Sequence, residues 1–148
     1  MNSRVPLLQS CAMDVITEVK KLDLPLGQYV VVGSGIMAQL GLREANDVDI
    51  AVTPDLYAKL RACGEWEENK RYGKIFLKKG AVEIIPQLDW EDYPTTAEAA
   101  IASGTIIDGV PFMNLHELLA FKRALGRAKD LPDIALIEEH LAGLGGNA

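Results

Sequence analysis

The stretch YVVVGSGIMA, from Tyr29 to Ala38, decides how the fold of this chain is interpreted. Its apolar, β-branched first half predicts a buried strand, and Gly33-Ser34-Gly35 predicts a turn into a short helix that ends near Gly41. A strand, a glycine loop and a helix in this order are typical of a phosphate-binding loop, because backbone N–H groups at the start of a helix bind anions. Two classes of nucleotide-binding protein begin in this way, and their chemistry differs.

The first class is the dinucleotide-binding fold, whose fingerprint G-x-G-x-x-G/A the loop matches. That fold needs a full-length helix after the glycines, a buried parallel strand, and an acidic residue about 20 residues further on, a position near Asp55. Here the helix is expected to stop at Gly41. The next strand, in NDVDIAVT, carries acidic residues where a sheet covered on both faces takes apolar ones. A dinucleotide-binding protein is therefore the less favoured interpretation.

The second class is indicated by the aspartates of NDVDIAVT. Asp47 and Asp49 are two residues apart, so their side chains share one face of a strand while Val48 and Ile50 pack on the other. Two adjacent carboxylates repel each other unless a cation lies between them. Mg²⁺ or Mn²⁺ takes carboxylate oxygens, and Mg²⁺ couples them to substrate phosphates. The alternative is a solvated edge strand with two incidental acids.

Glu83 is a third candidate ligand. It lies in AVEIIP, an apolar strand that is expected to form a hairpin with KIFLKK around a turn at Lys79-Gly80. A buried carboxylate is costly unless it is paired or bound to metal. If the two acidic strands are neighbours, Glu83 completes a metal site with Asp47 and Asp49. The alternative is a glutamate on the wet face of the sheet.

Lys122 is the unexpected residue of the helix that Asn114 is expected to cap. It falls on the apolar stripe of that helix and therefore points inward, together with Leu115, Leu118, Leu119 and Leu125. An inward lysine needs an anionic partner, and the phosphates of a nucleotide would be one. Alternatively, its stem runs along the stripe and its ammonium group reaches solvent.

The segment GRAKDLPD follows this helix. Asp130 is a plausible N-cap of the last helix, and Asp133 fits its first turn, where the helix dipole favours acidic residues. Capping is enough to explain both aspartates. Arg127 and Lys129 are expected to be surface charges, and the sequence assigns them no role.

The order of elements predicts a mixed α+β fold, in which a small mixed sheet packs beside flanking helices. The 148 residues are the size of one domain, and the 49% of hydrophobic residues supply a sizeable core. We expect an N-terminal helix within 1–27, a sheet core with the metal site at 28–113 and C-terminal helices at 114–144. Thr95 or Thr96 is expected to cap a helix before an Asp108-Gly109 turn.

Composition restricts the partners. A net charge of −6 argues against an extensive surface for duplex nucleic acid, because phosphate neutralisation supplies most of that affinity. Two separated cysteines, Cys11 and Cys63, indicate a reducing cytoplasm rather than a disulfide framework. No apolar run approaches the roughly 20 residues of a membrane helix, so no membrane association is expected.

Taken together, Gly33-Ser34, Asp47-Val48-Asp49 and Glu83 resemble the motifs of the DNA polymerase beta-like nucleotidyltransferase superfamily. The segment LLAFKRALGRAKDLPDIALI is similar to the Lys…Arg-x-Lys-Asp-x-x-Asp segment of its small, abortive-infection-type members. The resemblance extends roughly from Tyr29 to Leu141. The chain departs from the family pattern in its Gly-Ser-Gly loop, where a double glycine is commoner, and at Asn46, where these relatives often have threonine.

The resemblance implies a nucleotidyltransferase fold and an enzyme that transfers a nucleoside monophosphate from an NTP to a hydroxyl acceptor, releasing pyrophosphate. It implies that Asp47, Asp49 and Glu83 are catalytic and hold Mg²⁺ or Mn²⁺, and Glu83 is also a candidate general base. Gly33 and Ser34 would bind phosphate, and Lys122 would neutralise the triphosphate.

The resemblance names neither the nucleotide nor the acceptor, for which a small molecule, an RNA end and a protein are all open. The alternative is a non-catalytic nucleotide- or partner-binding module such as a toxin–antitoxin component. A chain this short has little room for an acceptor-binding domain. A protein partner or a homodimer that completes the cleft is therefore also a candidate.

Overall fold

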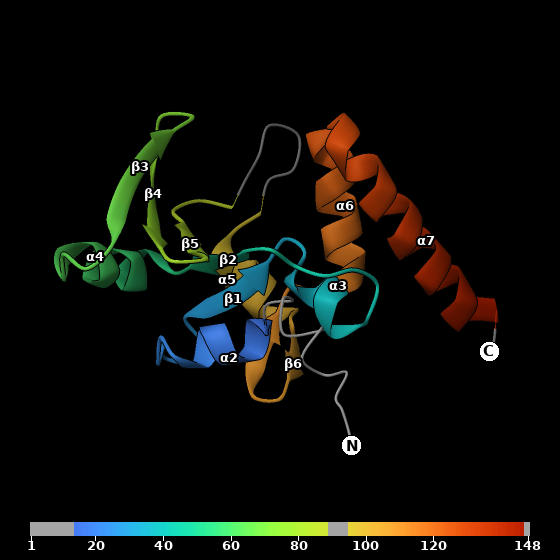
Figure 1. Cartoon of the computed structure of the whole chain (residues 1–148), viewed down its shortest axis with the longest axis horizontal. Helices are drawn as coiled ribbons and strands as arrows, with labels where there is room; N and C mark the ends of the chain where they lie inside the picture. The colour runs from blue at the N-terminus through green and yellow to red at the C-terminus, as the bar shows by residue number, and fades with distance from the viewer. Residues whose placement is uncertain (1–13, 89–94, 147–148) are drawn as a thin grey trace, which may run out of the picture.

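The structure, a computed structural model of the chain, describes residues 14–88 and 95–146. Its centre is one sheet of seven strands in the order β3-β4-β5-β2-β1-β7-β6 (Figure 1). In chain order these strands are β1 (Tyr29–Val32), β2 (Val48–Val52), β3 (Glu67–Arg71), β4 (Lys74–Lys79), β5 (Val82–Ile85), β6 (Thr105–Ile107) and β7 (Val110–Phe112). The predicted α+β fold with a helical C-terminus is confirmed.

The middle of the sheet mixes parallel and antiparallel pairs. β2 runs antiparallel to β1 and parallel to β5, and β7 runs parallel to β1 on its other side. The first two strands of a dinucleotide-binding fold are parallel. The antiparallel pairing of β1 with β2 is therefore incompatible with the dinucleotide interpretation.

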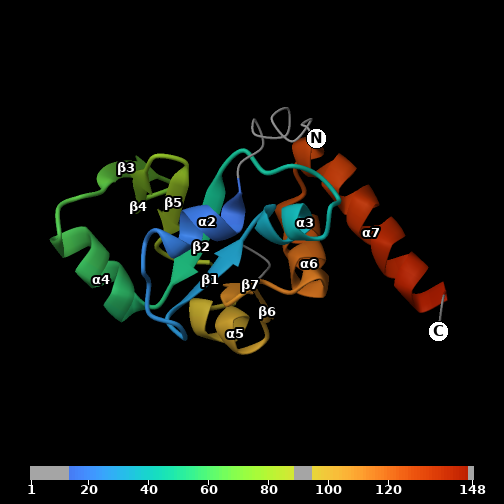
Figure 2. The same cartoon turned by 60° about the horizontal axis from the view of Figure 1, so that its bottom comes forward.

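Helices cover the sheet and extend beyond one end of it. They are α2 (Val15–Lys20), α3 (Gly35–Gln39), α4 (Pro54–Ala62), α5 (Ala97–Ala102), α6 (Leu115–Leu125), a short 3₁₀ helix η1 (Ala128–Asp130), and α7 (Leu131–Gly146). α2 and α5 lie on opposite sides of β1 (Figures 1 and 2), and all four residues of β1 are buried. The expected N-terminal helix is described only from residue 14, since residues 1–13 lie outside the described part.

Local capping chemistry sets where several helices begin and end. The Thr96 side chain accepts a hydrogen bond from the backbone N–H of Ala99 at 3.0 Å, and Asn114 accepts one from Glu117 at 2.8 Å. Gly126 takes a left-handed φ of +62° directly after α6. These contacts satisfy backbone groups that helix ends leave unpaired, and they confirm both expected N-caps.

The predicted hairpin at Gly80 and the predicted turn at Asp108-Gly109 are both present, and a further hairpin was not foreseen. β4 pairs antiparallel with β5 across Gly80, and β6 pairs with β7 across Asp108-Gly109. The unforeseen hairpin joins β3 to β4 through Tyr72 and Gly73, both with positive φ. β3 escaped sequence analysis because its residues are all polar and mostly exposed, so no apolar alternation marks it.

Within the described residues, no helix has both the length and the apolar character needed to cross a bilayer.

Candidate active site

Sheet register brings the acidic residues into one row. Asp49 on β2 lies opposite Val32 of β1 on one side and opposite Glu83 of β5 on the other. Aligned residues on neighbouring strands point to the same face of a sheet, so the two carboxylates are neighbours. β2 is a central strand of the sheet. The alternative in which these acids lie on an edge strand is therefore wrong.

A cleft of about 490 Å³ lies over this row of carboxylates. One side is formed by the β3–β4 hairpin and the other by α6, η1 and the start of α7, two groups of elements that stand apart in Figure 1. All the residues that the sequence suggested for the site line this cleft: Gly33, Ser34, Asp47, Asp49, Glu83 and Lys122. They come from β1, β2, β5 and α6 or from the loops beside them, so the fold brings together residues that are up to 89 positions apart.

Asp49 is the most perturbed carboxylate of the site. Burial raises its pKa, and the neighbouring charges of Asp47 and Glu83 raise it further, to about 6 from an ordinary value of 3.8. Arg71 and Lys122 act in the opposite direction but do not compensate. Ionisation of the Asp49 carboxyl therefore costs free energy, and a bound cation would lower that cost.

Gly33 makes room for that carboxylate. Its φ is +70°, and a Cβ atom at this position would lie 2.9 Å from Oδ2 of Asp49. Gly35 is constrained from the other side, because its Cβ would lie 2.6 Å from Cγ1 of Val31. Both glycines of the loop therefore have packing reasons, in addition to the phosphate role that the sequence suggested for Gly33. Ser34 is the N-cap residue of α3, but its side chain makes no capping hydrogen bond.

The three acids differ in how well they fit a metal. In the described part of the chain, no three Asp, Glu, His or Cys side chains are arranged so that they could hold one ion. Glu83 is occupied by a cation already, since its Oε2 accepts a hydrogen bond from Nη2 of Arg71 at 2.5 Å. Asp47 and Asp49 offer the oxygen donors and the excess negative charge that suit Mg²⁺. The pair fits an ion in donor chemistry, whereas the ion pair between Glu83 and Arg71 has to open before Glu83 can join them.

Lys122 points inward as predicted, with only 8% of its side chain exposed. The alternative in which its ammonium group reaches solvent is therefore wrong. Its Nζ lies 3.1 Å from Oδ1 of Asp130 and 3.2 Å from Oδ2 of Asp133. The chain itself therefore supplies the anionic partner that an inward lysine needs.

The two aspartates belong to a buried ion network. Arg127 donates to Asp130, and Arg43 donates from one nitrogen to both oxygens of Asp133 at 2.9 Å. Burial alone would raise the pKa of Asp130, but the hydrogen bonds from Arg127 and Lys122 outweigh it and hold that pKa below its ordinary value. Helix capping is therefore not enough to explain these aspartates, since both carboxylates are buried partners of cations.

Sequence reasoning assigned no role to Arg43, Arg71 and Arg127, three arginines that line the cleft. Arg43 lies in the loop between α3 and β2 and contacts a residue 90 positions away, so no local pattern marks it. Arg71 ends β3. The only signal that could have found it is the Tyr72-Gly73 turn, which predicts a polar edge strand before KIFLKK.

Comparison of the chain with protein-family models, with curated proteins and with solved structures gives no significant match.

Proposed function

We propose that this protein is a metal-dependent nucleotidyltransferase that transfers a nucleoside monophosphate from an NTP to a hydroxyl group. One observation carries the proposal: Asp49 and Glu83 are in register at the centre of the sheet, beside Asp47 and the Gly33-Ser34 loop, under a cleft of about 490 Å³. A volume of this size is within the range of small-molecule sites. The carboxylate pair and the positive charge across the cleft suit a metal and a triphosphate.

In this proposal Asp47 and Asp49 hold the divalent cation. Bound there, Mg²⁺ would supply positive charge that offsets the charge of the phosphates and polarises the reacting phosphoryl group. Glu83 accepts the proton of the acceptor hydroxyl as its oxygen attacks the α-phosphorus and pyrophosphate leaves. Gly33 keeps the backbone close to Asp49, which orients that carboxylate.

In this proposal a network of charged side chains, and not Lys122 alone, neutralises the triphosphate. Lys122, Arg43 and Arg127 carry three positive charges, and Asp130 and Asp133 carry two negative ones. One positive charge therefore remains on the cleft wall. Such a wall attracts a polyphosphate while its members stay fixed by one another.

The test is transfer of label from NTPs to a fractionated cell extract in the presence of Mg²⁺. Each NTP is supplied in two forms, labelled at the α-phosphate or at the γ-phosphate, and the protein, RNA and small-molecule fractions are analysed. Nucleotidyl transfer predicts that α-label enters one fraction, whereas γ-label is released as pyrophosphate. Mass spectrometry of the labelled fraction then identifies the base and the acceptor.

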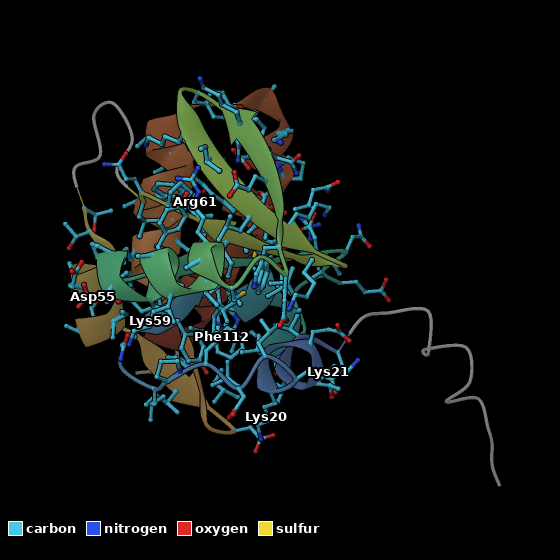
Figure 3. The ribbon with its side chains drawn as sticks, turned by 90° about the vertical axis from the view of Figure 1, so that its left-hand side faces the viewer. Lys20, Lys21, Asp55, Lys59, Arg61 and Phe112 are labelled. Atoms are coloured by element: carbon cyan, nitrogen blue, oxygen red, sulfur yellow. The ribbon has the colours of Figure 1, made fainter. Side chains whose placement is uncertain are left out.

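A matched pair of variants ties the activity to the site. Asp49→Asn removes one charge from the cleft, and Asp55→Asn removes one from the exposed first turn of α4 (Figure 3). We expect Asp49→Asn to abolish transfer and Asp55→Asn to retain it. Transfer of γ-label instead of α-label would point to a kinase. No transfer by the wild type, together with Mg²⁺-independent NTP binding, would favour a non-catalytic binding module.

A further inference from the structure

The β3–β4 hairpin carries a cation that reaches into the carboxylate cluster. Arg71 is the last residue of β3, and its guanidinium donates to Glu83, which also lies opposite Lys78 of β4. The guanidinium also lies over the Phe76 ring, 4.3 Å from its centroid. Stacking on an aromatic ring limits the orientations of a guanidinium, so Arg71 is held with its donors toward the cleft.

The two partners of this ion pair differ in exposure. The Arg71 side chain is 47% exposed, whereas the Glu83 side chain is only 19% exposed. A long, half-exposed side chain on an edge hairpin can change partner by rotation of its own bonds, while a mostly buried carboxylate on a central strand stays in place. If the pair opens, Arg71 is therefore the group that moves.

The ion pair between Arg71 and Glu83 also conflicts with the proposed roles of Glu83 as a general base and a metal ligand. While the Arg71 guanidinium donates to a carboxylate oxygen of Glu83, that oxygen is not available to accept a proton or to bind a metal. An arginine fork binds phosphate with the same geometry as carboxylate. We propose that Arg71 is a phosphate-binding residue that exchanges Glu83 for the polyphosphate chain of the substrate, so that binding of the substrate frees Glu83. The identity of the substrate in this inference rests on the proposed function, whereas the presence of an anion site does not.

The test uses inorganic tripolyphosphate as the probe, titrated calorimetrically into the metal-free protein. Arg71→Gln removes the fork, and we expect the affinity to fall by about ten- to a hundredfold, the factor that corresponds to a charged hydrogen bond. The control is Arg61→Gln. Arg61 forms a similar pair with Glu68 of β3, has a side chain 44% exposed, and lies on α4 outside the cleft (Figure 3). The control should change the affinity less than about twofold, because exposed charges outside the site are screened.

A double-mutant cycle tests the exchange itself. Glu83→Gln removes the competing carboxylate, so tripolyphosphate should bind more tightly, and by a larger factor than in Asp47→Asn, which removes a cleft charge without freeing Arg71. In the Arg71→Gln background the gain from Glu83→Gln should shrink to the Asp47→Asn level, because no arginine is left to be released. Mn²⁺ titration of Arg71→Gln without nucleotide should show tighter metal binding, since Glu83 is then available.

Several results would overturn the inference: no tripolyphosphate binding by the wild type, equal effects of Arg71→Gln and Arg61→Gln, or an undiminished gain from Glu83→Gln when Arg71 is absent. If Arg71→Gln does not fold, Arg71→Lys replaces it, and an unchanged affinity there contradicts the need for a fork. Arg71-dependent tripolyphosphate binding without label transfer would reject the nucleotidyltransferase and keep the anion site. Label transfer together with tripolyphosphate binding that does not depend on Arg71 would keep the nucleotidyltransferase and reject the anion site.

Discussion

Replacement of Lys122 by methionine tests the buried network that the structure places beside the cleft. Lys122→Met keeps the length of the side chain and its apolar stem and removes the charge. A lysine without a partner in the chain would leave the free energy of unfolding unchanged or raise it. Because the ammonium group lies 3.1 Å and 3.2 Å from two buried carboxylates, we expect a loss of stability instead.

The magnitude follows from what remains after the substitution. Removing one member of a buried ion pair costs about 3–5 kcal/mol when the partner is left alone. Here Asp130 keeps Arg127 and Asp133 keeps Arg43, and both arginines are partly exposed. The two carboxylates are therefore only partly uncompensated. We therefore expect a loss of about 2–4 kcal/mol, somewhat below the range for an uncompensated partner.

Urea unfolding of the ligand-free protein, followed by circular dichroism, measures this loss. For a protein of this size the midpoint should fall by roughly 1–2 M urea, with an unchanged slope. The control is Arg123→Gln, on the same helix, which breaks an exposed ion pair with Glu138. It should cost less than about 1 kcal/mol, because exposed pairs contribute little.

Equal unfolding midpoints for wild type and Lys122→Met would refute the reasoning. That result would mean that the network contributes nothing to the folded state. Lys122 would then have to be regarded as a group that is free for ligands. A loss of stability in Arg123→Gln as large as that in Lys122→Met would also refute the reasoning, since burial would then have no influence on how much an ion pair stabilises the fold.

Two further predictions concern the carboxylate row. The folded-state pKa of Asp49 is raised from 3.8 to about 6, so its contribution to stability is complete below pH 3.8 and is lost as the pH rises through about 6. In metal-free buffer Asp49→Asn, which mimics the protonated form, should stabilise the protein by up to about 3 kcal/mol at pH 8 and by almost nothing at pH 4, as urea unfolding at both pH values will show. Gly33→Ala should lower the stability of the protein more than Gly41→Ala. Gly41 has a similar φ of +74°, but a Cβ there would meet no atom within 4 Å. Equal losses in thermal unfolding would contradict the close approach of Gly33 to Asp49.

Much of the local structure followed from short-range sequence signals. The N-caps Thr96 and Asn114, the turns at Gly80 and at Asp108-Gly109, and the inward face of Lys122 each depend on residues a few positions apart. Such signals act through backbone hydrogen bonds and side-chain periodicity, which adjoining residues determine by themselves. The α+β class followed from the same patterns. The family resemblance and the metal, which also came from the sequence, remain predictions.

The tertiary structure alone decided which residues are partners. The sequence showed that Lys122 needs an anion, and the fold supplies Asp130 and Asp133 in place of a nucleotide. The sequence marked Glu83 as a costly carboxylate, and the fold pairs it with Arg71 from a strand too polar to be recognised. Electrostatic partners are set by distance in space. A charged residue can satisfy its need with any opposite charge that the chain brings near it, and no spacing along the sequence specifies which one.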